Sequence, residues 1–205
     1  MTRMRIPSWY RFSARTLKRT SYDKTNRAYL TESSLPVINF DLLKEWYRDN
    51  VLGKGREIPA SNDALYISDD RIVFIEFKNK KNIGTWGRQG LYHKISSSIF
   101  LLLDSRLSIA WRRPDFQCSL DYMRGNMEYI FVYNQAKRGN ARQALLGTMN
   151  QRAKFDLGGL EGFLFSKVRT YNMDEFGKFF VRPEEKKRMK HWNLKKCIGT
   201  HRRQR

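Results

Sequence analysis

The run from Ile72 to Lys78 places the strongest limit on how this chain can fold. Its apolar side chains fall on both faces of an extended strand, with one set formed by Ile72 and Phe74 and the other by Val73, Ile75 and Phe77. A strand that is apolar on both faces is typical of the middle of a sheet covered on both sides. The chain must therefore supply further strands beside this run and helices above and below it.

A second strand is predicted immediately before the first, from Asp63 to Ile67, and the polar stretch Ser68 to Arg71 between them indicates a hairpin. A two-residue turn pairs Ser68 with Arg71, and a four-residue loop pairs Ile67 with Ile72. Both choices give the same register. Counting outward from the turn places Asp63 directly opposite Glu76.

The remaining elements are predicted from hydrophobic periodicity. A helix should follow Asn39, and a second should cover Gln89 to Leu103 with its inward side formed by Leu91, Ile95, Ile99 and Leu102. Short or later elements are predicted at residues 56–58 (strand), 128–133 (strand), 139–153 (helix) and 162–168 (strand). This order indicates an α/β fold, a small mixed sheet flanked by helices.

Three regions are expected along the chain. Residues 1–30 form a basic N-terminal arm, partly ordered at best; residues 31–183 form one domain; and residues 184–205 form a basic C-terminal tail, a helix that fades out. No run of about 18 apolar residues occurs, so no membrane-spanning helix is expected. The N-terminus also lacks the apolar stretch of a secretory signal, which favours a cytoplasmic protein.

Charge restricts the class of partner. Forty Lys and Arg residues against 20 Asp and Glu residues give a formal net charge of +20. Such a surface attracts polyanions and favours nucleic acid as the partner. An anionic membrane would also be attracted, but no clear amphipathic anchor is found. A solvated basic surface without a specific partner is the alternative.

The chemistry of the chain is expected where the hairpin register brings acids together. Residues that face each other on antiparallel strands have Cβ atoms roughly 5 Å apart. Asp63 and Glu76 would therefore repel one another, and Lys78 would point to the same face as Glu76. A divalent cation such as Mg²⁺ or Mn²⁺ offsets this repulsion, because it favours oxygen ligands and retains reactive waters. The alternative is a surface ion pair between Glu76 and Lys78 at a strand end.

The segment from Asn62 to Asn79 resembles the active site of the PD-(D/E)XK nuclease superfamily, in which an acid begins one strand and an acid and a lysine end the next. The likeness covers roughly residues 40–135. It implies a restriction endonuclease-like αβββαβ core and magnesium-dependent hydrolysis of phosphodiester bonds. It further implies that Asp63, Glu76 and the carbonyl of Phe77 bind the metal and that Lys78 is catalytic. Asn62 stands where the family name has proline.

Further positions follow from the same resemblance. Some members carry another acid on the first helix, for which Asp41 and Glu45 are both candidates. On the second helix, Gln89 and Tyr92 resemble a glutamine–tyrosine element, with a spacing one residue short. Neighbouring cations would contact phosphate, namely Arg88 and Lys94.

Several alternatives stay open at this point. The chain could be a catalytically inactive nucleic-acid-binding protein of the same fold, or a basic RNA-associated structural protein. DNA is favoured over RNA only by the resemblance, a homodimer is not excluded, and the setting could be a phage or a mobile element. A zinc site in the tail would need a distant fourth ligand beyond its three candidates, His191, Cys197 and His201.

Overall fold

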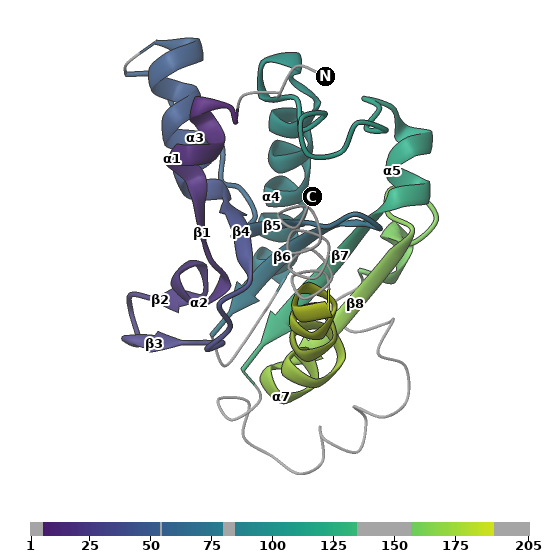
Figure 1. The fold of residues 1–205 in the computed structure, drawn as a ribbon. Coiled ribbons are helices and arrows are strands. Elements are labelled where there is room, and N and C mark those ends of the chain that lie inside the picture. Colours follow the sequence, from purple (N-terminus) through teal and green to yellow (C-terminus); the bar gives the residue numbers. More distant parts are fainter. Residues whose placement is uncertain (1–5, 54, 80–84, 135–156, 191–205) are drawn as a thin grey trace, which may run out of the picture.

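The computed structural model describes residues 6–53, 55–79, 85–134 and 157–190, and only the backbone of residues 85–88. A six-stranded mixed sheet forms the centre, in the order β1-β4-β5-β6-β7-β8, and a separate two-stranded sheet pairs β2 with β3 (Figure 1). The predicted fold class, a mixed sheet flanked by helices, is confirmed.

The central hairpin has the predicted register. The strands β5 (Ala64–Ile67) and β6 (Ile72–Lys78) run antiparallel, with Ala64 paired to Ile75 and Ile67 paired to Ile72. Beyond β6 the sheet is parallel, continuing through β7 (Met127–Tyr133) and β8 (Lys167–Asn172). A mixed sheet of this kind needs a crossover between β6 and β7, and the helix α4 (Thr85–Leu103) lies in that connection.

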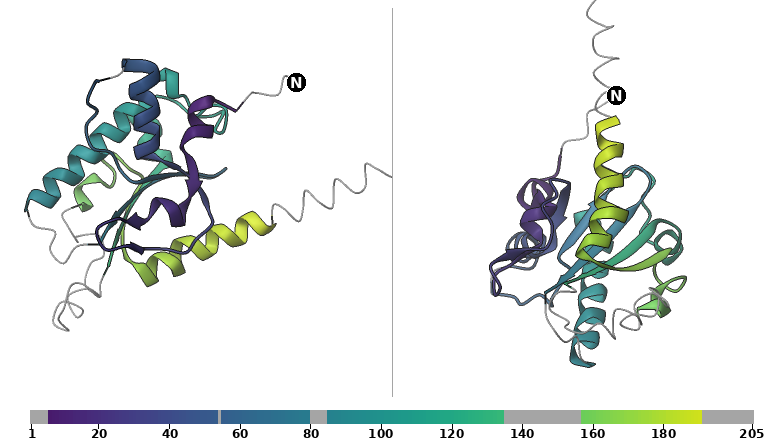
Figure 2. Two further views of the ribbon diagram at one scale, coloured as in Figure 1. Left: turned by 90° about the vertical axis from the view of Figure 1, so that its left-hand side faces the viewer. Right: turned by 90° about the horizontal axis from the view of Figure 1, so that it is seen from below.

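Each face of β6 is buried in its own hydrophobic core, as its two-sided pattern predicts. Phe74 lies in one core together with Leu91 and Ile95 of α4. Ile75 lies in the other core, together with Phe176 and buried residues of the C-terminal helix. Figure 2 shows the sheet between α4 on one side and the C-terminal helix on the other. The buried side predicted for α4 is confirmed, because its four apolar positions are at most 7% exposed.

The helix after Asn39 is also present. α3 (Phe40–Tyr47) begins where the side chain of Asn39 accepts a hydrogen bond from the backbone of Leu42 at 3.0 Å, and it continues as a π-helical turn, η1 (Arg48–Leu52), up to Gly53. The strand predicted at residues 56–58 is wrong: this stretch has no regular structure. The neighbour of β5 is instead β4 (Pro36–Asn39), so a strand comes before the helix rather than after it.

The N-terminal arm was expected to be partly ordered at best, but the described part of that segment is regular. It forms five short elements: α1 (Ser8–Ser13), β1 (Ala14–Thr16), α2 (Leu17–Thr20), β2 (Tyr22–Asp23) and β3 (Ala28–Tyr29). Strand β1 pairs with β4 at the edge of the sheet. Trp9 and Leu17 are buried and hold the segment to the body.

The C-terminal part differs in detail from the prediction. The last strand is β8, five residues later than the predicted start at residue 162, while residues 158–160 form the turn η5 (Gly158–Leu160). α7 (Met173–Phe176) and η6 (Gly177–Val181) continue into a helix over residues 182–190. The predicted boundary at residue 184 therefore falls inside a continuous helix. The helix predicted at 139–153 lies outside the described residues.

Two further elements, η2 (Ser105–Leu107) and α5 (Leu120–Asn126), complete the connection from α4 to β7. In the described residues no helix has the length and apolar character needed to cross a bilayer.

Candidate active site

The sheet register brings Asp63 and Glu76 together. Asp63 directly precedes β5, and the pairing of Ala64 with Ile75 makes Asp63 and Glu76 the next facing pair. The backbone fixes the Asp63 carboxylate further, because the N–H of Phe77 donates a hydrogen bond to Asp63 Oδ2 at 2.6 Å. The predicted opposition of the two acids is thus present in the structure.

A lysine from α4 joins the two carboxylates. The ammonium of Lys94 donates to Glu76 Oε1 at 2.7 Å and to Asp63 Oδ1 at 3.4 Å. Sequence reasoning assigned Lys94 to phosphate contact and missed this role. The signal was available, since Lys94 lies three residues after Leu91 and four before Ser98, both buried, and therefore on the inward side of the helix.

Burial sets the electrostatics of the pair. Glu76 is 0% exposed, whereas the side chain of Asp63 keeps 22% of its surface open. Burial first, and then the negative charge of Asp63, raise the pKa of Glu76 to about 8, although Lys94 acts in the opposite direction. Burial also raises the pKa of Asp63, against the opposing effects of Lys94 and the Phe77 N–H. Two carboxyls kept this close favour a cation or a proton between them.

Two buried polar atoms at this site have no hydrogen-bond partner among the described residues, Glu76 Oε2 and the hydroxyl of Tyr129. Tyr129 lies on β7, and its pKa is raised well above the ordinary value by burial and then by the charges of Glu76 and Asp63. Leaving a buried acceptor unsatisfied costs roughly 1–3 kcal/mol. Tyr129 was not predicted as a site residue, because in the sequence it is one aromatic among several in an apolar strand.

Lys78 lies on the Glu76 face of β6, two residues further on. It is half-buried, and its charge lowers the pKa of Glu76. In the described part of the chain no carboxylate forms an ion pair with Lys78, so the Glu76–Lys78 surface pair considered above does not form. The side chain of Phe77 points to the opposite core, where it packs edge-to-face against Phe176; whether its carbonyl binds a metal stays a prediction.

Of the two candidates on the first helix, Asp41 is the one close to the pair. Its charge raises the pKa of Asp63, after the larger effects of burial, Lys94 and Phe77. Its carboxylate lies 3.5 Å from the ammonium of Lys44. Glu45 is exposed on α3, and its charge acts on Arg48 instead.

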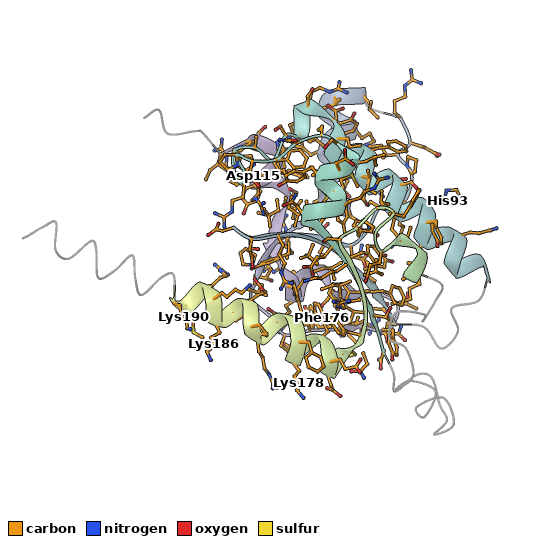
Figure 3. The ribbon with its side chains drawn as sticks, turned by 90° about the vertical axis from the view of Figure 1, so that its right-hand side faces the viewer. His93, Asp115, Phe176, Lys178, Lys186 and Lys190 are labelled. Atoms are coloured by element: carbon orange, nitrogen blue, oxygen red, sulfur yellow. The ribbon has the colours of Figure 1, made fainter. Side chains whose placement is uncertain are left out.

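The other predicted nucleic-acid contacts lie on α4. The side chains of Gln89 and Tyr92 are exposed. His93 also points outward (Figure 3). The side chain of Arg88 lies outside the described residues, and a role in binding nucleic acid stays a prediction for all of these.

The donor set suits a hard divalent cation. Mg²⁺ is commonly held by one or two carboxylates with waters completing its shell, and the free Oε2 of Glu76 beside Asp63 offers such ligands. Among the described residues no group of three or more His, Cys, Asp or Glu side chains is placed to hold a metal.

The tail candidates for zinc lie outside the described residues. Cys118, the distant cysteine, is exposed, and its thiol donates a hydrogen bond to the carbonyl of Leu103.

A scan against protein-family models finds no match to this chain, and searches of curated proteins and of solved structures find none either.

Proposed function

We propose that this protein is a metal-dependent nuclease that hydrolyses phosphodiester bonds, with DNA as the favoured substrate. One observation carries the proposal: two carboxylates from neighbouring strands converge, one of them fully buried with an unpartnered oxygen and a pKa raised to about 8. Facing carboxylates destabilise a hairpin when both are charged, and Lys94 offsets only part of that cost. Perturbed carboxyls of this kind cluster at functional sites.

Each residue of the site has a separate role in this proposal. Asp63 and Glu76 would hold a Mg²⁺ or Mn²⁺ ion, which when bound polarises a phosphoryl oxygen and lowers the pKa of a coordinated water. The Phe77 N–H keeps the Asp63 carboxylate oriented. Lys78, which has no carboxylate partner in the described residues, would balance the charge that develops on the phosphoryl oxygens.

The surface charge supports a polyanionic substrate. The formal charge of +20 favours the phosphate backbone, which binds basic proteins with little sequence preference. Part of this charge lies on the C-terminal helix, where Lys178, Lys186 and Lys190 point away from the body (Figure 3).

A second candidate is a nucleic-acid-binding protein without catalysis. The position of Lys94 favours it, because an ammonium that contacts both carboxylates already neutralises part of their charge without a metal. The two candidates differ in whether cleavage occurs and in whether it depends on Glu76.

The test is a cleavage assay on labelled DNA and RNA, each single-stranded and double-stranded, with Mg²⁺, with Mn²⁺ and with EDTA. We expect metal-dependent cleavage that falls by at least about a hundredfold in Glu76→Gln and Lys78→Met, within the usual range for groups acting on the transition state. Asp121→Asn is the matched control, because that carboxylate is 93% exposed on α5.

Cleavage that survives in Glu76→Gln or in EDTA would not arise at the proposed metal site and would refute the proposal. Binding without cleavage in the parent protein would establish the second candidate.

A further inference from the structure

The small sheet β2–β3 carries an exposed pair of aromatic rings. Tyr22 and Tyr29 are cross-strand partners, 40% and 43% exposed, with ring centroids 4.8 Å apart. The ammonium of Lys18 lies 4.8 Å from the centre of the Tyr29 ring. Single exposed tyrosines are common, whereas two exposed rings in contact are informative; the ammonium of Lys18 also pairs with Glu32.

The loop that joins the two strands adds positive charge. Lys24 and Arg27 are exposed there, and neither forms an ion pair with a carboxylate of the described residues. The Asp23 carboxylate organises the loop by accepting hydrogen bonds from the backbone of Thr25 and Asn26 at 2.9 and 3.2 Å. Arg27 adopts a left-handed φ of +49°, which is uncommon for a residue other than glycine. The loop between β2 and β3 therefore has a conformation fixed by hydrogen bonds, and it presents two cations to solvent.

This hairpin reaches the end of β6. Asn79 follows Lys78 directly, and its side chain hydrogen-bonds to Asp23. Burial acts to raise the pKa of Asp23, but the hydrogen bonds from Asn26, Asn79 and Thr25 prevail and lower it. Asn79 also accepts a hydrogen bond from Asn134 at the end of β7, at 2.9 Å. The β2–β3 hairpin thus sits beside the end of β6, and the buried residues that flank it, Leu17 and Leu30, lie in the core on the face opposite Glu76.

We propose that the hairpin formed by residues 22–29 binds an unpaired DNA strand near the end of β6, through base stacking on Tyr22 and Tyr29 and phosphate contacts to Lys24 and Arg27. Every base has a face that stacks on an aromatic ring, and a basic groove follows the backbone. In a duplex the base faces are already stacked on one another, so exposed rings favour a single strand. This inference rests on the proposed function for its choice of DNA, and binding tests it without cleavage.

A structural role for the rings is the competing explanation, because cross-strand aromatic pairs stabilise hairpins. Three variants separate the two explanations. Tyr22→Thr with Tyr29→Thr removes the rings but keeps a high strand propensity, and Tyr22→Phe with Tyr29→Phe keeps the rings. Arg27→Gly removes the cation while relieving the positive φ, so it should not lower stability.

The experiment uses the full chain carrying Glu76→Gln, in EDTA, with fluorescence anisotropy on a labelled DNA strand of about 15 nucleotides and on its duplex. We expect the double Thr variant to lose at least about fivefold in single-strand affinity, a conservative figure for two stacking contacts. Duplex affinity should change by less than about twofold, and the double Phe variant should bind like the parent.

Arg27→Gly should reduce the slope of log K against log salt for the single strand by about 0.7, the value for one phosphate. Phe163→Ser is the matched control, since that ring is 66% exposed in the segment before β8.

Melting temperatures measured in parallel show whether the hairpin variants stay folded. The proposal is overturned if the double Thr variant binds the strand as tightly as the parent, or if single-strand and duplex affinity fall equally. Tighter binding of the equivalent RNA strand would overturn the choice of DNA. A parent protein that never cleaves would refute the proposed nuclease activity and leave this binding result standing.

Discussion

At the scale of single residues, Glu76 is the feature that most needs an explanation. It sits in the middle of a buried strand where a valine would pack without penalty, and its only hydrogen-bond donor among the described residues is Lys94. A charged carboxylate in such a place is retained only at a cost in stability. That cost can be measured.

Replacing Glu76 by Gln should stabilise the metal-free protein at high pH. The pKa of Glu76 rises from an ordinary value of 4.5 to about 8 in the folded state, so between these values the folded state holds a proton that the unfolded state lacks. The parent protein therefore loses stability as pH rises through this window, whereas Gln cannot titrate. We expect the advantage of Gln to be small near pH 5 and to reach a few kcal/mol near pH 8, since each pKa unit corresponds to about 1.4 kcal/mol.

Urea unfolding in EDTA across this pH range measures the effect, with Asp121→Asn as the exposed control. Parallel stability curves for the parent and Glu76→Gln would contradict the raised pKa.

At the scale of secondary structure, the hairpin was predictable because its loop is short and its strands alternate regularly. The loop leaves one register, and that register alone places Asp63 opposite Glu76. The inward position of Lys94 could also have been predicted, since helical spacing puts it on the inward side of α4. A lysine on a buried stripe indicates a buried acid, but the sequence does not show which acid.

Other elements could not be predicted, for identifiable reasons. β4 spans only Pro36–Asn39 and begins with proline, which suggests a loop. The strands β1, β2 and β3 are two or three residues long, so no period can be detected, and the pairing of β1 depends on a partner distant in the sequence. The Asp23–Asn79 contact, which brings the hairpin to the end of β6, has no signature in the sequence at all.

The C-terminal helix should be a structural part of the domain rather than a tail. Glu184 is 1% exposed and accepts hydrogen bonds from Tyr66 and Arg71, both at 2.7 Å. Glu184→Ala would leave the half-buried Arg71 with a single carboxylate partner among the described residues, Glu128. We expect a loss of roughly 3 kcal/mol in the free energy of unfolding, as for other broken buried pairs.

Chemical denaturation at neutral pH measures this loss, with Lys186→Ala as the control, an exposed position where changes stay within about 0.5 kcal/mol. Burial opposes ionisation of Glu184, but its hydrogen bonds prevail and lower its pKa. The contribution of Glu184 should therefore be present above its ordinary pKa and fade as the pH falls below it. An unchanged stability for Glu184→Ala would restore the interpretation of this segment as an appended tail.

At the scale of the whole molecule, positive charge is found on two elements, the β2–β3 hairpin at the end of β6 and the C-terminal helix. Both lie on the side of the sheet opposite α4 (Figure 2). Both carry cations near exposed rings: on the helix Lys178 lies 5.0 Å from the centre of the Phe179 ring, whereas the hairpin presents two exposed rings together. The two surfaces should therefore differ in what they contribute to binding.

Charge on the C-terminal helix should strengthen binding to DNA of any form without selecting single strands. Lys186→Gln with Lys190→Gln removes two exposed cations. On duplex DNA we expect the slope of log K against log salt to fall by up to about 1.8, because each phosphate that the protein no longer neutralises lowers the slope by about 0.9. Because these lysines would contact phosphate rather than bases, single-strand and duplex affinity should weaken together and their ratio should stay within about twofold. Anisotropy titrations in the Glu76→Gln background, at several salt concentrations, measure both quantities. A variant that bound single strands more weakly but duplex DNA as before would show that the unpaired strand follows the C-terminal helix rather than the hairpin.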